Sequence, residues 1–373
     1  MKTIRIAAAI ALAFSLNVQA AESVPQERPI GHAERVFAFH DAMPTGVSVS
    51  ETGRIFVNFP QWGDDVKFSV GELRDGRVVA YPSQAANADF SSVQSVVADG
   101  RGKLWVLDTS APGFAAPKAP KLVAVDLATD QVSISIAFPS SVILPTTYVN
   151  DVRFDFRVGA QGVAYVTDSS LSGPGAIIVL DLASGKAQRR LSGHASTSPD
   201  PDFIPTVEGE SMKVRTGDGS TQKFTVASDG IALSADGQTL YYSPLSSRHL
   251  YSVPAALLRD PKVSEAQLAA AVKDLGEKGA SDGLEADANG ALYATDYEHN
   301  SIRKRAPDGS WTTIASDGRL LWPDTMSIGP DGYLYFTANQ LHRQAIFHGG
   351  HDQREKSYGL FRVKIDARPA PTK

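Results

Sequence analysis

The sequence predicts an all-β protein: one six-bladed β-propeller, closed by an N-terminal strand that completes the last blade. Three observations support this fold class. One strand–turn–strand pattern recurs six times, further strands follow each copy, and the two ends of the propeller region carry complementary incomplete pieces. The pattern is clearest at residues 281–300, SDGLEADANGALYATDYEHN. There, alternating apolar and polar residues flank an Asn-Gly turn, which is typical of a β-hairpin.

The six copies recur at fairly regular intervals. They begin at Thr45, Gln94, Asn150, Asp229, Asp282 and Asp324. Intervals near ~50 residues indicate a repeat architecture rather than several independent domains. A third strand is predicted after each hairpin, at residues 68–73, 121–127, 176–182, 249–253, 301–305 and 359–365. A fourth is predicted at residues 77–81, 132–138, 187–191 and 311–315. Four short antiparallel strands per repeat make one propeller blade.

The ends of the repeat region predict how the ring closes. The sixth repeat stops at its third strand, residues 359–365, whereas residues 34–40 (ERVFAFH) precede the first repeat without a blade of their own. We expect these two segments to pair as the outer strands of one blade. This pairing would remove two exposed strand edges.

The first 20 residues carry the features of a secretory signal peptide. Lys2 and Arg5 form a basic start, residues 6–16 are apolar, and Val-Gln-Ala at 18–20 fits a cleavage site. The apolar run is too short to span a bilayer. We therefore expect a linker at 21–33, the propeller at 34–366 and a tail at 367–373. The protein would be secreted or periplasmic, without membrane attachment after cleavage.

Two insertions interrupt the repeat. Residues 192–225 contain three prolines and an extra hairpin built from residues 211–215 and 222–226. Residues 254–278 are predicted to be helical, because Ser264 and Gln267 have capping-box spacing and an apolar stripe follows. That stripe consists of Leu268, Ala271, Val272 and Leu275. Insertions on a propeller commonly lie over a face, where ligands bind.

Composition excludes some classes of function. A net charge of −5 and the absence of any basic run argue against a nucleic-acid surface. The chain has no cysteine, which excludes disulfides and thiolate chemistry. A phosphate-cradling glycine loop and a nucleophile elbow are also absent from the sequence. We expect a monomer whose partner is a small molecule.

The repeat alignment predicts a cluster of polar side chains at one end of the channel. Residues just before the first strand of each blade lie at one mouth, which gathers Thr45, Gln94, Asn150, Asp229, Asp282 and Asp324. Loops after the second strands would add Asp108, Asp168 and Asp296 to that face, and Asp151 adjoins Asn150. Tyr148, Trp62 and Trp322 are placed to supply aromatic neighbours. The predicted mouth is rich in oxygen atoms and negatively charged.

Three interpretations of this mouth are open. Its oxygens suit a hard cation such as Ca²⁺, which accepts carboxylates, amides and water in flexible geometry. They equally suit an organic cation held by charge-assisted hydrogen bonds and cation–π contact. Alternatively, Asp and Asn before a strand simply bind turn N–H groups. The candidate catalytic residues are Asp282, Asp229 and Asn150. The candidate ligand-binding residues are Gln94, Tyr148, Asp324, Trp322, Asp168 and Asp296.

Several segments resemble the Yellow/major royal jelly protein family. They include GVSVSETGRIFVNFPQW, DGLEADANGALYATDYEHN and LLWPDTMSIGPDGYLYFTANQLHR, and the resemblance runs from about residue 33 to 363. It implies a six-bladed propeller with a ligand-accessible channel. It also implies one of several functions: dopachrome-tautomerase-like activity, the binding of biogenic amines, or a nutritional or signalling role. In the first case, a carboxylate at the mouth would transfer the ring proton.

A more distant resemblance is to the senescence marker protein/gluconolactonase family of calcium-dependent lactonases. Asn150 and Asp282-Gly283 match two metal-ligand positions of that family, but Thr45 stands where it has a glutamate. This resemblance implies a calcium-assisted lactonase as an alternative to a tautomerase or a non-catalytic amine binder. His342, His348 and His351 also lie close in sequence, but we interpret them as loop histidines rather than a zinc site.

Overall fold

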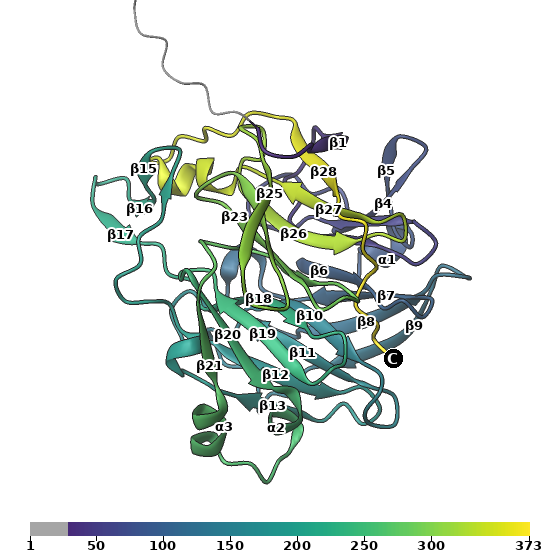
Figure 1. Cartoon of the computed structure of the whole chain (residues 1–373). Helices are drawn as coiled ribbons and strands as arrows, with labels where there is room; N and C mark the ends of the chain where they lie inside the picture. The colour runs from purple at the N-terminus through teal and green to yellow at the C-terminus, as the bar shows by residue number, and fades with distance from the viewer. Residues whose placement is uncertain (1–28) are drawn as a thin grey trace, which may run out of the picture.

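The computed structural model describes residues 29–373, so the predicted signal peptide at 1–20 lies outside the described residues. Six four-stranded antiparallel sheets follow one another along the chain, as predicted (Figure 1). The innermost strand of each sheet contacts the innermost strand of the next, and the last contacts the first. The protein is therefore a closed six-bladed β-propeller.

Each of the first five blades uses consecutive strands, from the innermost to the outermost. The first three blades are β2 (Val47–Val49), β3 (Ile55–Asn58), β4 (Val70–Arg74) and β5 (Arg77–Ala80); β6 (Val93–Ala98), β7 (Lys103–Asp108), β8 (Lys121–Asp126) and β9 (Gln131–Ala137); and β10 (Val149–Asp155), β11 (Val163–Asp168), β12 (Ala176–Asp181) and β13 (Ala187–Arg190). The fourth and fifth are β18 (Ser228–Leu233), β19 (Thr239–Pro244), β20 (His249–Pro254) and β21 (Lys273–Glu277); and β22 (Leu284–Ala286), β23 (Leu292–Asp296), β24 (Ser301–Arg305) and β25 (Trp311–Ser316).

The sixth blade confirms the predicted closure. It consists of β26 (Pro323–Ile328), β27 (Tyr333–Ala338), β28 (Tyr358–Lys364) and, as its outermost strand, β1 (Glu34–Phe39). In this antiparallel pair Glu34 lies opposite Arg362, and Phe39 lies opposite Tyr358. Because β1 satisfies the outer edge of β28, the two ends of the propeller region share one sheet.

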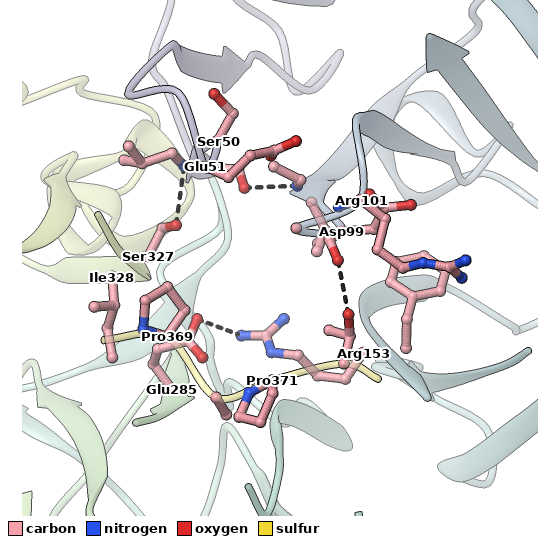
Figure 2. A pocket seen from close by; sticks show the side chains of 18 of the residues that line it. Ser50, Glu51, Asp99, Arg101, Arg153, Glu285, Ser327, Ile328, Pro369 and Pro371 are labelled. Carbon is pink, nitrogen blue, oxygen red and sulfur yellow. Dashed lines mark hydrogen bonds and ion pairs between the residues drawn. The ribbon is translucent and has the colours of Figure 1, made fainter. Parts of the chain in front are cut away.

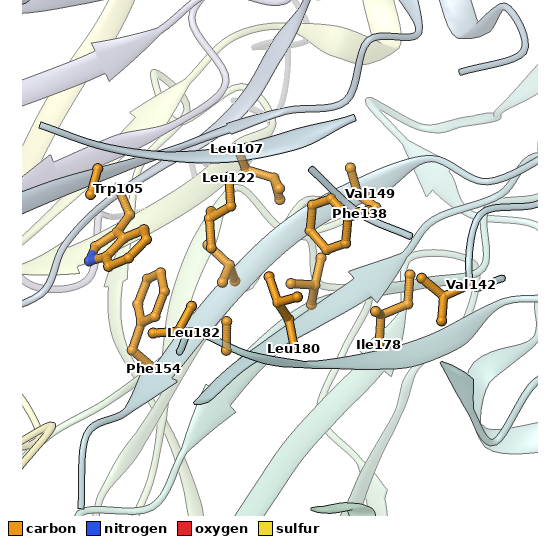
Figure 3. Close-up of a cluster of buried hydrophobic side chains, with 14 residues drawn as sticks. Trp105, Leu107, Leu122, Phe138, Val142, Val149, Phe154, Ile178, Leu180 and Leu182 are labelled. Atoms are coloured by element: carbon orange, nitrogen blue, oxygen red, sulfur yellow. The ribbon is translucent and has the colours of Figure 1, made fainter. Parts of the chain in front are cut away.

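Apolar side chains between neighbouring blades form the core. Figure 3 shows one such cluster, in which Trp105 and Leu122 of the second blade pack against Phe154, Ile178 and Leu180 of the third. All five are almost completely buried. Alternation along each strand directs these side chains towards the adjacent blade, so the packing stabilises the ring as a whole.

The prediction for residues 254–278 was partly wrong. Helices α2 (Ala255–Arg259) and α3 (Glu265–Ala271) are present, and α3 begins with the predicted capping box of Ser264 and Gln267. The chain then leaves the helix at Val272, and β21 pairs with β20 as the fourth strand of the fourth blade. Residues 273–277 gain more from pairing with the otherwise open edge of β20 than from continuing the helix, although Val272 and Leu275 fit the helical apolar stripe.

The other insertion forms two small hairpins apart from the blades. One joins β16 (Lys213–Arg215) to β17 (Thr221–Lys223), within the predicted hairpin but with shorter strands. The second, which the sequence did not reveal, joins β14 (Thr206–Val207) to β15 (Glu210–Ser211). A short helix, α1 (Gln84–Asn87), follows the first blade.

Among residues 29–373, no helix has the length and apolar character needed to cross a membrane.

Candidate functional site

The polar residues predicted at the mouth lie where the innermost strands are irregular. The pairing of β6, β10, β18 and β26 with their neighbours shifts register close to the start of each strand. These irregular steps contain Gln94, Asn150, Asp229 and Asp324 respectively. A β-bulge re-aims a side chain that regular alternation would direct into the blade interface. Asp282 lies just before β22.

Glycines beside these aspartates allow the innermost strands to approach closely. A Cβ on Gly230 would collide with the carbonyl oxygen of Asp282, and a Cβ on Gly283 would collide with that of Asp324. The Asp-Gly pairs therefore reflect close contact between neighbouring strands rather than a tight turn.

The structure brings five of the six mouth positions around one small cavity of about 40 Å³. We call this the carboxylate cavity, after Asp229, Asp282 and Asp324. Its polar lining is Gln94, Asn150, Ser169, Asp229, Asp282 and Asp324. Its apolar and aromatic lining includes Trp62, Phe114, Tyr148, Leu171, Phe224 and Leu341. Thr45 does not line it, because its hydroxyl accepts a hydrogen bond from Asn58 within the first blade.

Each aspartate of the cavity is held through at least one carboxylate oxygen. Oδ2 of Asp229 accepts hydrogen bonds from Nδ2 of Asn150 (2.7 Å) and the Ser169 hydroxyl (3.1 Å). Oδ2 of Asp282 accepts the indole N–H of Trp322 at 2.8 Å. Asp324 is anchored by the side chains of Asn339 and Thr325. These contacts fix the three carboxylates in place before any ligand arrives.

The three carboxylates are buried without a cationic partner. Each of these aspartates is less than a tenth exposed. Within residues 29–373, no Lys, Arg or His forms an ion pair with any of them. Burial, reinforced by the charge of Asp282, raises the pKa of Asp229 and of Asp324 well above the usual range. Burial likewise raises the pKa of Asp282, to about 6. The cluster therefore holds protons near neutral pH unless a cation enters.

Lys278 is the basic residue whose charge acts on this cluster from nearby. Its side chain is completely buried, and its ammonium donates a 3.0 Å hydrogen bond to the carbonyl of Gly279. Burial lowers the pKa of Lys278 to about 7, although Asp296, Asp229 and Asp282 oppose this effect. The amine is thus only partly charged at neutral pH and compensates the carboxylates incompletely.

Stacked aromatic rings form one wall of the cavity. The ring centroids of Trp62 and Phe114 lie 5.1 Å apart, and those of Phe114 and Tyr148 lie 4.5 Å apart. The indole N–H of Trp62 donates to the Tyr148 hydroxyl, which in turn donates to Oε1 of Gln94, both at 2.9 Å. This network orients the wall. Sequence analysis missed Phe114, whose only signal was a large apolar residue in an otherwise small-residue loop.

Several predicted residues lie outside the cavity. The carboxylate of Asp168 accepts the N–H groups of Tyr148 and Ser170 and pairs with Arg189. Asp108 likewise binds backbone N–H groups of its own loops, and Asp296 pairs with His299. Trp322 does not line the cavity but stands behind Asp282 as its hydrogen-bond donor. The three aspartates at the ends of the second strands therefore bind nearby N–H groups and basic side chains instead of facing the cavity.

Below the carboxylate cavity, a charged cluster occupies the channel. Arg153 donates to both oxygens of Asp151, at 3.0 and 3.1 Å, and pairs with Glu285 at 3.6 Å. Beyond this cluster lies a larger lower chamber of about 390 Å³ (Figure 2). Figure 2 shows Pro369 and Pro371 of the C-terminal segment beside Arg153 and Glu285.

The C-terminal segment crosses the lower end of this chamber. The N–H of Ala288 donates to the carbonyl of Arg368 at 2.9 Å, and the N–H of Phe156 donates to that of Thr372 at 2.8 Å. The Thr372 hydroxyl also donates to the carbonyl of Asp99 at 2.8 Å. The segment therefore joins the second, third and fifth blades.

Metal-ligand geometry is not evident in the described part of the chain. No group of three or more His, Cys, Asp or Glu side chains there has the arrangement of a metal site. The three cavity aspartates and Asn150 offer oxygen atoms that suit a hard cation in kind. His342 forms a 2.7 Å contact from Nε2 to Glu208.

Comparison with known proteins places this propeller in a family. A family model described as "Major royal jelly protein" matches residues 91–372. The chain belongs to the major royal jelly protein family. This confirms the first resemblance drawn from the sequence.

Curated relatives of this family member include Protein yellow of Drosophila subobscura. It is 27% identical over 258 residues, which cover 62% of this chain and 43% of the relative. The matched region is thus less than half of that relative's length.

Solved structures similar to this family member include two propellers. One is described as a calcium-binding protein, regucalcin, from Agrobacterium tumefaciens (16% identity, TM-score 0.54, 90% of this chain and 95% of that chain). The other is described as a putative gluconolactonase (13% identity, TM-score 0.55, 91% and 95%). At such identities the likeness shows a shared fold alone.

Proposed function

We propose that this family member binds a small protonated amine with an aromatic body in the carboxylate cavity. The observation that carries the proposal is the burial of Asp229, Asp282 and Asp324 together without a cationic partner among the described residues. An ammonium group would supply the missing charge and donate several charge-assisted hydrogen bonds. The positive charge would also favour the ionised form of the carboxylates, which burial disfavours in the empty cavity.

The aromatic wall suits the body of such a ligand. Trp62 and Phe114 stack on each other, and Tyr148 is tilted against Phe114, within the same cavity lining as the carboxylates. Aromatic faces attract a neighbouring cation and stack on an aromatic ring. The combination of a carboxylate floor and an aromatic wall therefore favours an amine such as dopamine over a purely polar cation.

The size of the cavity adds a condition. About 40 Å³ accommodates a few water molecules or an ion, whereas small-molecule sites usually measure about 300–1,000 Å³. An aromatic amine therefore requires part of the apolar roof to move outward. Phe224 and Leu341 belong to this roof and lie outside the blade strands, Phe224 in a loop and Leu341 in the short 3-10 helix Leu341–Arg343.

Proton transfer is the catalytic activity that the same site would support. A group with a pKa of about 6, as burial gives Asp282, is suited to accept and return a proton near neutral pH. Tautomerisation of an oxidised catechol ring moves one proton and needs no cofactor. In this proposal Asp282 transfers the proton, and Asn150 orients Asp229 beside it.

A calcium-dependent lactonase is the second candidate. The small volume and the oxygen atoms of Asp282, Asp229 and Asn150 favour a hard cation. Calcium held by these residues would polarise an ester carbonyl. The absence of a three-ligand arrangement in residues 29–373 weighs against it.

A thermal-shift experiment distinguishes the two candidates. We expect dopamine to raise the melting temperature, with no response to calcium or to a chelator. Stabilisation by calcium that a chelator removes, without any response to dopamine, would favour the lactonase. If dopamine, calcium and a lactone all leave the melting temperature unchanged, both candidates fail.

We also propose that the protein is exported and acts as a monomer. The basic and apolar pattern of residues 1–20 supports export. N-terminal sequencing of the exported protein should begin at Ala21, and size-exclusion chromatography with light scattering should give the mass of one chain.

A further inference from the structure

We infer that residues 200–226 form a lid over the carboxylate cavity, held shut by a latch between Glu208 and the pair His342 and Arg343. This segment is the insertion between the third and fourth blades. The inference rests on the proposed function, since it identifies the gate through which a ligand reaches that cavity. The experiments below separate failure of the lid from failure of ligand binding.

The segment covers the cavity with apolar side chains. Phe224 and Val226 line the cavity directly. Earlier in the segment, Phe203, Val207 and Met212 are buried in an apolar cluster with Trp322 and Leu341. The roof of the site is therefore one face of this insertion, and moving the insertion would uncover the carboxylates.

The insertion is attached to the blades mainly through side chains. Strands β14 and β15 pair only with each other, as do β16 and β17. Within the described structure, backbone-to-backbone hydrogen bonds join only the two ends of the lid to the fourth blade: the N–H of Asp200 donates to the carbonyl of Ser246, and the N–H of Ser246 donates to the carbonyl of Val226. A segment with few backbone hydrogen bonds to its surroundings can open without unfolding the rest of the protein.

Glu208 provides an ionic attachment, in which one carboxylate contacts two basic side chains. It occupies the two-residue turn between β14 and β15, where Glu208 and Gly209 have φ angles of +50° and +81°. Positive φ at both central positions is typical of a type I′ turn, which projects the Glu208 side chain from the tip of the hairpin. Its carboxylate accepts from Nε2 of His342 at 2.7 Å and from Nε and Nη2 of Arg343 at 2.8 and 2.6 Å.

The latch also contacts Trp322, the residue that holds the carboxylate of Asp282. The ring of His342 stacks on Trp322, with centroids 6.0 Å apart and an interplanar angle of 19°. Trp322 is the donor to Asp282. Release of Glu208 from His342 would therefore loosen the packing behind Asp282 at the moment that the lid opens.

The lower end of the channel offers no alternative route in this conformation. Arg153, paired with Asp151 and Glu285, separates the carboxylate cavity from the lower chamber. The C-terminal segment then crosses the outer end of that chamber. Ligand exchange through the channel would require the ion pairs of Arg153 to break. Exchange through the roof would require release of Glu208 together with single hydrogen bonds such as those from Thr206 to Glu298 and from Arg215 to the carbonyl of Phe347.

Dopamine-binding kinetics of a latch variant test the inference. Glu208→Ala should raise the association rate constant of dopamine by about fivefold or more, and its Kd should fall or stay the same. A weaker latch increases the fraction of open protein but leaves the contacts in the cavity intact. The matched control is Glu210→Ala, in the same hairpin, whose side chain makes no hydrogen bond within the described residues. Unchanged rates in Glu208→Ala, or a change in Kd alone, would overturn the lid.

Cross-linking the lid in its closed position should have the opposite effect on the rates. The chain has no cysteine, so a Glu208→Cys and Arg343→Cys double variant can be joined specifically with a short bis-maleimide. Cross-linking should slow dopamine association by more than about tenfold relative to the same variant before cross-linking. Association at the same rate before and after cross-linking would contradict a lid.

Trypsin cleavage measures lid opening without any ligand. Lys213, Arg215 and Lys223 lie in the lid. Cleavage after these residues should be about fivefold faster in Glu208→Ala than in Glu210→Ala. If the parent protein binds no dopamine, the proposed function fails, and this comparison alone decides the lid: equal cleavage rates overturn it, and faster cleavage in Glu208→Ala supports it.

Discussion

Trp322 donates its indole N–H to Oδ2 of Asp282 across 2.8 Å, and both side chains are buried. The indole also stacks on Tyr297, with ring centroids 4.0 Å apart. A rigid aromatic pair therefore holds one carboxylate beside two others at the channel mouth. Burial of this carboxylate and its two neighbours disfavours their ionised form in the folded protein.

Asparagine in place of Asp282 should stabilise the protein at pH 8. Because burial raises the folded-state pKa of Asp282 to about 6, the folded protein binds this proton more tightly than the unfolded chain does. The stability contributed by the bound proton is complete at low pH and is lost as the pH rises from about 4 to about 6. Asp282→Asn should thus gain up to about 3 kcal/mol at pH 8 and little at pH 4.

Urea unfolding at the two pH values measures this gain. Asparagine still accepts the Trp322 hydrogen bond, so packing is preserved. The control is Asp65→Asn, which removes the same charge from an exposed position. A loss of stability at pH 8 in Asp282→Asn would show that the carboxylate is compensated in the folded state.

Removal of β1 should destabilise the propeller severely. A chain lacking residues up to Asp41 would leave the outer edge of β28 unpaired, and exposed strand edges promote aggregation. Calorimetry should show a large drop in melting temperature or irreversible aggregation. The control Glu34→Gln, which loses only the surface ion pair with Arg362, should cost no more than about 1 kcal/mol. A truncated chain that melts like the parent would disprove the role of this closure.

Deletion of residues 368–373 should lower stability by a smaller amount. It removes backbone hydrogen bonds to the third and fifth blades and the hydrogen bond from the Thr372 hydroxyl to the second blade. At about 1 kcal/mol for each of a few hydrogen bonds, we expect a loss of roughly 2–4 kcal/mol in denaturant unfolding. Unfolding at the parent's denaturant midpoint would show that the segment does not hold the ring together.

Leucine in place of Trp62 should weaken dopamine binding by about tenfold, because the wall loses both a cation–π face and the donor to Tyr148. A fluorescence titration gives the affinity. Trp311→Leu, on the outermost strand of the fifth blade, is the matched control and should bind like the parent. Equal affinities in the two variants would exclude the aromatic wall from the site.

Much of the fold was predictable because it repeats. Six copies of one pattern indicated the blades, and the incomplete last copy indicated that residues 34–40 would close the ring. The alignment also placed Asn150, Asp229, Asp282 and Asp324 together, since equivalent positions in a propeller meet at one end of the channel. Strand β21 was not predicted because it is stabilised by pairing with the edge of β20, and the sequence of residues 273–277 alone carries no strand pattern.

The details of the site depend on features that do not repeat. The roof comes from an insertion and from single loops, so Phe114 and Phe224 had no equivalent in other repeats. The sequence could not separate Asp168 and Asp296 from the cavity aspartates, because both groups adjoin strand ends. The difference lies in the bulges that turn Asp229 and Asp324 towards the channel, whereas Asp168 accepts N–H groups of its own loop.

Isothermal titration with a matched pair of ligands tests the central claim most directly. One ligand is dopamine, and the other is the same catechol with a hydroxyl group in place of the ammonium. If the buried carboxylates bind the positive charge, the neutral alcohol should bind at least about a hundredfold more weakly than dopamine, because each lost charge-assisted hydrogen bond contributes about 1.5–3 kcal/mol. In Asp282→Asn, the affinity for dopamine should fall and that for the alcohol should change little. Equal affinities of the parent for the amine and the alcohol would contradict the account.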